Sequence, residues 1–162
     1  MAGVSIAQEL AGHLLTCRIP DHLIGEPSEK PFQVWTGQRV AEWLNQSALH
    51  AKALVELAGG GVRAVHVPPT SFWPDVAVLS DESSGLLAVE VKCLTRTGLP
   101  GSVATSIGQA FIYRERYDEC LIVLFVVEPL SVELPEGVLT RLASQNVHAA
   151  TIPAYHGMMI SG

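Results

Sequence analysis

The sequence predicts a mixed α/β fold, with a central β-sheet that carries helices on its faces. Three observations lead to this expectation. Short apolar, β-branched runs follow one another after residue 61, which is typical of strands. The polar residues 80–85 separate two of these runs, as in a β-hairpin. The later runs are separated by segments of helical periodicity, which is the pattern of strand–helix–strand crossovers.

The amino-terminal third of the chain is expected to be helical. Residues 3–16 place apolar side chains at the spacing of a short amphipathic helix. Residues 18–31 hold three prolines and a glycine and predict a loop. Residues 36–58 are again periodic, with a break between two helices at residues 45–47. We therefore expect an arm over residues 1–31, packed on its own core or on a partner subunit, and a domain over residues 32–162.

The rest of the chain is expected to alternate strands and helices. The predicted strands are residues 62–67, 75–79, 86–93, 120–127 and 147–152, and the predicted helices are residues 102–117 and 135–145. Ser102 is the expected N-cap of its helix, and Pro135 lies near the first turn of the last one. The run 120–127 is almost wholly apolar, so it is expected to be a central strand buried on both faces.

Composition excludes several classes of protein. Hydrophobic residues make up 48% of the 162 residues and charged residues 16%, which excludes a disordered chain. The longest apolar run has eight residues, whereas a membrane-spanning helix needs about 20. No secretion signal is recognisable, so we expect a cytoplasmic protein, in the host cytoplasm if virus-encoded. The net charge of −6 argues against a protein that coats nucleic acid.

The three cysteines give no sign of a metal site or a disulfide framework. Cys17, Cys93 and Cys120 are odd in number, far apart in the sequence, and form no CxxC pair. We expect reduced, buried thiols.

An acidic residue and a lysine interrupt one of the apolar strands. Glu90 and Lys92 lie two residues apart, so alternation sends both side chains to the same face of the sheet. Charges are rarely buried without a partner. If Asp75 lies on the neighbouring strand of the hairpin, the three side chains converge. Carboxylates are the ligands that Mg²⁺ prefers, and a metal with a nearby cation suits phosphodiester hydrolysis.

Pro74-Asp75 followed by Glu90-Val91-Lys92 resembles the PD-(D/E)XK motif of the restriction-endonuclease-like nuclease superfamily. The expected order of elements is similar to the αβββαβ core of that fold, over residues 36–127 and onward to 152. The resemblance implies a DNA-cleaving enzyme that uses Mg²⁺ or Mn²⁺. It implies that Asp75, Glu90 and the Val91 carbonyl bind the metal and that Lys92 positions the attacking water.

Gln109 and Tyr113 lie four residues apart in a predicted helix and resemble the QxxxY motif of RecB-type nucleases. The resemblance implies that Gln109 contacts Lys92 and that Tyr113 binds DNA. The alternative for Tyr113 is a core aromatic with its hydroxyl at the surface. Arg114 and Arg116 continue this helix, where they either meet phosphates or form a solvated helix end.

Superfamily members also use an acidic residue from the first helix. Glu42 lies in a segment that resembles the corresponding helix of archaeal Holliday-junction resolvases, and Glu56 is the second candidate. Both are otherwise surface charges. His50 is the candidate for the upstream histidine of RecB-type enzymes. After the third strand, Thr95 and Arg96 are expected to contact the phosphates of the scissile strand.

Several functional readings stay open at this level. Endonuclease, exonuclease and junction resolvase are not separated, and resemblance to a resolvase implies a two-fold homodimer. The low basic content favours an alternative, a catalytically inactive DNA-binding or assembly module of the same fold. A third reading is an unrelated α/β binding protein in which Glu90 and Lys92 merely pair. That reading predicts that Asp75 points away from Glu90.

Overall fold

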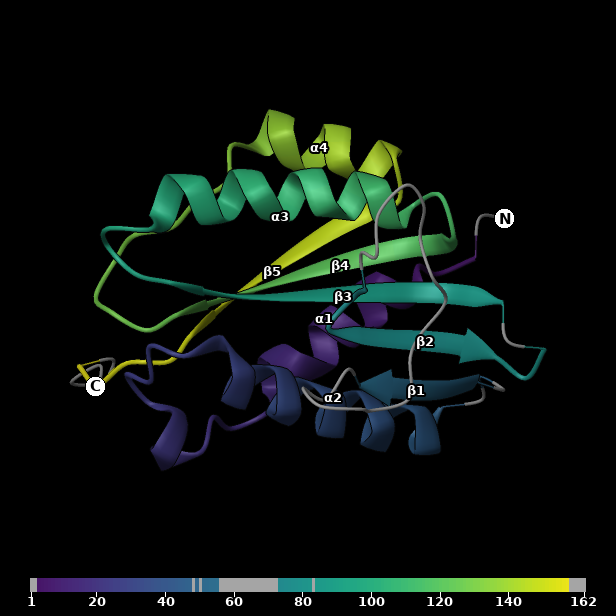
Figure 1. Cartoon of the computed structure of the whole chain (residues 1–162), viewed down its shortest axis with the longest axis horizontal. Coiled ribbons are helices and arrows are strands. Elements are labelled where there is room, and N and C mark those ends of the chain that lie inside the picture. Colours follow the sequence, from purple (N-terminus) through teal and green to yellow (C-terminus); the bar gives the residue numbers. More distant parts are fainter. Residues whose placement is uncertain (1–2, 48, 50, 56–72, 83, 158–162) are drawn as a thin grey trace.

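The computed structural model describes residues 3–47, 49, 51–55, 73–82 and 84–157. Helices and strands follow one another in the order shown in Figure 1. The elements are α1 (Ile6–Thr16), the 3₁₀ turn η1 (Asp21–Leu23), α2 (Glu29–Gln46), β1 (Ala51–Val55), β2 (Val76–Ser80), β3 (Gly85–Leu94), α3 (Leu99–Tyr113), β4 (Tyr117–Val126), α4 (Glu136–Ser144) and β5 (Val147–Pro153).

The five strands form one mixed sheet in the order β1–β2–β3–β4–β5. Neighbouring strands are antiparallel from β1 to β3 and parallel from β3 to β5. The parallel pairs need crossovers, which α3 and α4 supply. The expected mixed α/β class and the hairpin between the second and third strands are therefore confirmed.

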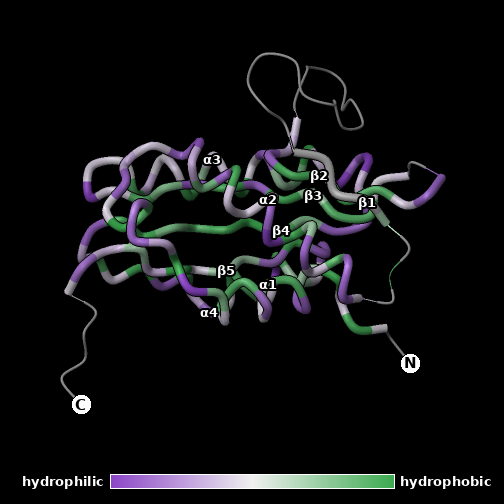
Figure 2. Tube along the Cα trace, turned by 90° about the horizontal axis from the view of Figure 1, so that it is seen from below, coloured by the Kyte–Doolittle hydropathy of each residue, from purple (hydrophilic) through white to green (hydrophobic). Residues whose placement is uncertain are grey.

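Helices cover both faces of the sheet (Figure 1). Helices α1 and α2 pack on one face, where Phe32 stacks on Phe125 at 4.4 Å between ring centroids and Trp35 meets the same ring edge-on. Helices α3 and α4 pack on the other face through Ala110, Tyr113 and Leu142. Figure 2 shows the hydrophobic residues gathered along the central strands between the helices. Strand β4 is buried along most of its length, as its apolar sequence predicts.

Helix α1 belongs to the core of the domain. Its side chains Ala7, Leu10 and Leu14 are buried against the sheet. Glu119 on β4 accepts hydrogen bonds from the amides of Ile6 and Ala7, at 3.0 and 3.3 Å, and from the Ser5 hydroxyl. The first backbone amides of a helix have no acceptor within the helix, and Glu119 supplies one for Ile6 and Ala7. Of the two placements expected for the amino-terminal arm, the structure shows packing on its own core.

Residues 51–55 form strand β1, not the predicted second half of a helix. The five-residue run AKALV is too short for periodicity to separate a strand from a helix. Pairing along β2, from Ala51 opposite Ser80 to Val55 opposite Val76, holds it in the sheet. The predicted strand over residues 62–67 lies outside the described residues.

Two helices begin earlier than predicted. Helix α2 starts at Glu29, inside the predicted loop, because Pro31 falls in its first turn, where proline removes no hydrogen bond. Helix α3 starts at Leu99, so its N-cap is Gly98 and not Ser102. Pro100 occupies its first turn, and α3 ends at Tyr113 instead of residue 117.

Within the described part of the chain, none of the helices is both long enough and apolar enough to cross a membrane.

Candidate active site

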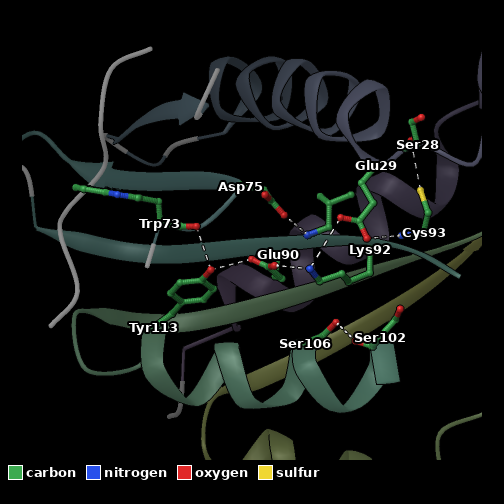
Figure 3. Close-up of polar contacts among 11 residues, drawn as sticks. Ser28, Glu29, Trp73, Asp75, Glu90, Lys92, Cys93, Ser102, Ser106 and Tyr113 are labelled. Atoms are coloured by element: carbon green, nitrogen blue, oxygen red, sulfur yellow. Dashed lines mark hydrogen bonds and ion pairs between the residues drawn. The ribbon is translucent and has the colours of Figure 1, made fainter. Parts of the chain in front are cut away.

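The candidate site lies where β3 extends past the start of β2 (Figure 3). The β2–β3 ladder begins with Val76 opposite Val89. Continued by two residues, this register places Pro74 opposite Val91, and proline has no amide hydrogen with which to continue the ladder. The carboxylate of Asp75 takes over the Val91 amide, with 2.7 Å from Oδ2 to the nitrogen. Pro74 thus ends the pairing, and Asp75 binds the part of the β3 edge that β2 leaves unpaired.

The Val91 carbonyl faces the same opening. In an extended strand the N–H and C=O of one residue point toward the same neighbouring strand. The Val91 amide donates to Asp75, so its carbonyl also points to the β2 side, where Pro74 cannot donate to it. This orientation agrees with the carbonyl role that the motif implies.

Glu90 is a buried carboxylate in the middle of β3. Its residue is only 2% exposed, and its side chain lies on the α3 face of the sheet (Figure 3). Oε1 lies 3.3 Å from the Lys92 ammonium, and Oε2 accepts a hydrogen bond from the Tyr113 hydroxyl at 3.0 Å. Burial raises the pKa of Glu90, and the opposing effects of Lys92 and Tyr113 do not cancel this shift.

Burial disfavours the ionised forms of both Asp75 and Glu90. Burial, followed by the charge of Glu90, raises the pKa of Asp75 to about 8. The Val91 amide and Lys92 act in the opposite direction but are outweighed. At neutral pH the pair therefore favours a bound proton or a bound cation.

Lys92 joins this carboxylate pair to helix α2. Its side chain is 16% exposed, and its ammonium lies 3.9 Å from Glu29 Oε2 as well as beside Glu90. Burial lowers the pKa of Lys92, but the charges of Glu90 and Glu29 outweigh that effect and the pKa is raised. The lysine therefore remains a cation and a hydrogen-bond donor.

Glu29 is a site residue that the sequence reasoning missed. It is the first residue of α2, and its Oε1 accepts the Cys93 amide at 3.5 Å, directly after Lys92. The neighbouring Ser28 carbonyl accepts the Cys93 thiol at 3.7 Å. The signal was present, because Ser28 is a preferred N-cap residue and Pro31 is tolerated in a first helical turn.

Tyr113 has a different environment from the one that the motif resemblance implied. It is only 1% exposed, so its ring belongs to the core and is not available for stacking on DNA. Its hydroxyl lies 3.0 Å from both Glu90 Oε2 and the Trp73 carbonyl, and not at the surface. Burial and the charge of Glu90 raise the pKa of Tyr113, so the hydroxyl keeps its proton and remains a donor.

Gln109, on α3, and Arg114, the C-cap of that helix, are not joined to the carboxylates by hydrogen bonds. Gln109 lies one turn before Tyr113, and its Oε1 is buried without a hydrogen-bond partner in the described part of the chain. The Arg114 side chain donates to the carbonyls of Gln145, at 2.8 Å, and Tyr117. Arg114 thus links the end of α3 to the following elements, and its guanidinium is engaged by these two carbonyls.

Glu42 lies away from the candidate site. It is an exposed residue that pairs with Arg39 at 2.8 Å. It follows Glu29 by 13 residues along α2, a rise of about 20 Å. Helix α2 therefore brings Glu29, and not Glu42, to Lys92. The alternatives Glu56 and His50 lie outside the described residues.

Thr95 and Arg96 follow β3 at the edge of the site. Arg96 is exposed, and its amide donates to Glu128 at 3.0 Å, whereas Thr95 is half-buried. A pocket of about 310 Å³ opens beside Lys92. Its lining comprises Glu29, Lys92, Gly98, Gly101, Ser102 and Thr105.

The donor atoms fit a hard cation that retains water. Among the residues described, no three His, Cys, Asp or Glu side chains are grouped closely enough to hold a metal by themselves. Magnesium keeps several waters and is bound in many proteins by one or two carboxylates. Asp75 and Glu90 supply two, the Val91 carbonyl faces the same opening, and the raised pKa values of both acids mark an unneutralised pair.

Comparison of the chain with protein-family models, with curated proteins and with solved structures gives no match. The functional argument therefore depends on the residues and their geometry.

Proposed function

We propose that this protein is a divalent-metal-dependent nuclease of the PD-(D/E)XK type that hydrolyses phosphodiester bonds in DNA. The observations that carry the proposal are that Asp75 accepts the Val91 amide, between Glu90 and Lys92, at the end of the β2–β3 ladder, and that Lys92 pairs with Glu90. The reading in which Glu90 and Lys92 merely pair requires Asp75 to point away. Asp75 instead accepts a hydrogen bond from the amide of Val91, the residue between those two. The charge of Glu90 also raises the pKa of Asp75.

The order of elements supports the same proposal. Elements α2, β1, β2, β3, α3 and β4 follow one another in the αβββαβ order that the resemblance implies. Strand β1 takes the first strand position, which the sequence reasoning had assigned to residues 62–67. The candidate residues lie on β3 and at the start of β2, as the motif requires.

Each residue of the candidate site has a separate role in the proposed reaction. A bound Mg²⁺ or Mn²⁺ would supply charge neutralisation at the phosphate and lower the pKa of bound water. Asp75 and Glu90 would hold that ion, with the Val91 carbonyl facing the same space. Lys92, a protonated donor beside Glu90, would orient the attacking water and stabilise charge on the phosphate. Glu29 holds the Lys92 ammonium from the α2 side.

A second candidate is a catalytically inactive module of the same fold that binds DNA or another protein. The net charge of −6 and the engagement of Arg114 by two carbonyls favour the form of this module that binds another protein. Against it stands the cost of burying two neighbouring carboxylates, which a protein without a bound cation has no reason to retain. The homodimer implied by resemblance to a resolvase stays a prediction.

The deciding experiment is cleavage of a substrate panel with Mg²⁺ or Mn²⁺: linear duplex, single strand, four-way junction and RNA. Asp75→Asn and Lys92→Ala are expected to lose roughly 10²–10³-fold in rate. Glu42→Gln, on the same protein but distant from the site, is the matched control and should cleave like the wild type. If no substrate is cut, or if the site variants cut as fast as the control, the inactive module becomes the leading interpretation.

A further inference from the structure

The Tyr113 hydroxyl contacts both chain segments that carry the carboxylates. It lies 3.0 Å from Glu90 Oε2 on β3 and 3.0 Å from the backbone carbonyl of Trp73, two residues before Asp75 (Figure 3). Tyr113 itself comes from α3, in the layer above the sheet. One side chain therefore links three parts of the site that are distant in the sequence.

We propose that Tyr113 is a positioning residue for metal binding, which fixes the Glu90 carboxylate relative to the segment that carries Asp75. The inference rests on the proposed function, because it assigns a role within the same site. It concerns geometry alone, since the buried tyrosine does not reach a substrate.

The Asp75 segment needs such a support. Asp75 precedes β2, whose ladder begins at Val76, so regular strand pairing does not hold its backbone. The Val91 amide restrains the Asp75 side chain. The Tyr113 hydroxyl, whose single proton is shared between Glu90 Oε2 and the Trp73 carbonyl, also restrains the backbone on the other side of Pro74.

The Glu90 side chain needs a second restraint as well, because a glutamate has several rotatable bonds. Lys92 lies beside Oε1, and Tyr113 donates to Oε2, so each carboxylate oxygen has its own partner. A carboxylate oxygen has more than one lone-pair direction, which leaves room on each for a cation. Lys92 and Tyr113 therefore orient the Glu90 carboxylate and leave lone pairs on both of its oxygens free.

Tyr113 is a rigid anchor for these contacts. Its ring is 1% exposed within the core between α3 and the sheet. The next residue, Arg114, is bonded to the carbonyls of Tyr117 and Gln145 and so fastens the end of α3. Partners of this kind, which orient metal ligands without touching the metal, change metal affinity or activity 10–100-fold when they are removed.

The test compares Tyr113→Phe with Tyr155→Phe. Both changes delete one phenolic hydroxyl, and Tyr155 packs at the margin of the same hydrophobic cluster, outside the site. Mn²⁺ affinity is measured by titration calorimetry, and the rate of DNA cleavage is measured as a function of Mn²⁺ concentration. Thermal unfolding of each variant without metal shows whether the fold is intact.

Tyr113→Phe is expected to weaken Mn²⁺ binding about 10–100-fold and to raise the half-maximal Mn²⁺ concentration for cleavage by the same factor. The rate at saturating Mn²⁺ should stay within about threefold of the wild type, because the reacting groups are retained. Tyr155→Phe should match the wild type in both measurements. A merely structural role would lower the unfolding temperature and leave the metal dependence unchanged.

Two results would overturn the inference while the wild type still binds Mn²⁺ and cleaves: unchanged Mn²⁺ affinity in Tyr113→Phe, or an equal loss in Tyr155→Phe. In either case the proposed nuclease would stand without this role for Tyr113. A wild type that neither binds Mn²⁺ nor cleaves would overturn the proposed function, and the inference with it.

Discussion

Two glutamates on adjacent strands, Glu90 on β3 and Glu119 on β4, are used in opposite ways. Glu119 receives two backbone amides and a hydroxyl at the start of α1, so its charge is met by donors from the helix that it caps. Glu90 is buried beside Asp75, and its two partners are the Tyr113 hydroxyl and the Lys92 ammonium. The same ammonium also pairs with Glu29. A carboxylate surrounded by donors stabilises the fold as an anion, whereas a buried carboxylate beside another favours a bound proton or a bound cation.

The largest expected effect is on the pH dependence of stability without metal. The pKa of Asp75 is about 8 in the folded protein and about 3.9 when unfolded, so the folded state binds the extra proton between these values. The free energy of unfolding should therefore fall as pH rises from about 4 to about 8. Glu90, with its raised pKa, adds to this fall, while the charges of Lys92 and Glu29 modulate it.

Asp75→Asn removes this penalty and should stabilise the metal-free protein at pH 8 by up to about 5 kcal/mol relative to the wild type, since each pKa unit corresponds to about 1.4 kcal/mol. Urea unfolding at pH 5 and pH 8 measures the difference. Addition of Mg²⁺ should recover the stability of the wild type at pH 8 but not increase that of the variant. A wild type whose stability rises between pH 5 and pH 8 would contradict the surplus of charge at Glu90 and Asp75.

Glu29→Gln tests whether α2 contributes to the site. The change removes the negative charge beside Lys92 but keeps a side chain of the same size. We expect a loss of about 10–100-fold in cleavage rate at fixed Mg²⁺, because Lys92 loses an orienting partner. Glu136→Gln serves as the control, because Glu136 is also the first residue of a helix but is exposed at the start of α4. Equal rates for the two variants would confine the site to the hairpin and α3.

Glu119→Ala tests the other half of the comparison. Loss of the cap should lower the free energy of unfolding by about 1–2 kcal/mol, since the first amides of α1 lose their acceptor. Metal affinity and cleavage at a temperature where the variant is folded should not change. Chemical denaturation with a parallel cleavage assay makes both measurements, and a selective loss of cleavage would link α1 to the site.

The smallest effect is expected for Glu42→Gln. Its ion pair with Arg39 is exposed, and pairs of this kind contribute roughly 0–1 kcal/mol. Stability should change by less than about 0.5 kcal/mol, as measured by thermal unfolding, and metal binding should be unaffected. A loss of metal affinity would restore Glu42 as the acidic residue of the first helix.

The hairpin and its charged residues could be predicted because their signals are local. Alternation in β3 places Glu90 and Lys92 on one face, and Pro74 marks the end of the neighbouring strand. Strand β1 could not be recognised, since a run of five residues carries too little periodicity and its pairing with β2 is a tertiary property.

The remaining contacts of the site depend on segments that are distant in the sequence. Glu29 lies 63 residues before Lys92 and begins a helix among prolines, so only packing of α2 on the sheet brings them together. The Tyr113 hydroxyl points inward because α3 crosses directly over Glu90, which the QxxxY spacing alone does not specify. The cap that Glu119 provides for α1 is long-range in the same way.

The β2–β3 ladder ends at Pro74. The hairpin is therefore expected to tolerate inserted residues at its turn but not at this end. One residue inserted between Asp75 and Val76 would turn Asp75 to the opposite face of the sheet, because side chains alternate along a strand. The far turn between β2 and β3, where Asp81, Glu82 and Ser84 are exposed, can be lengthened without moving any site residue. A peptide tag is therefore best inserted at that turn.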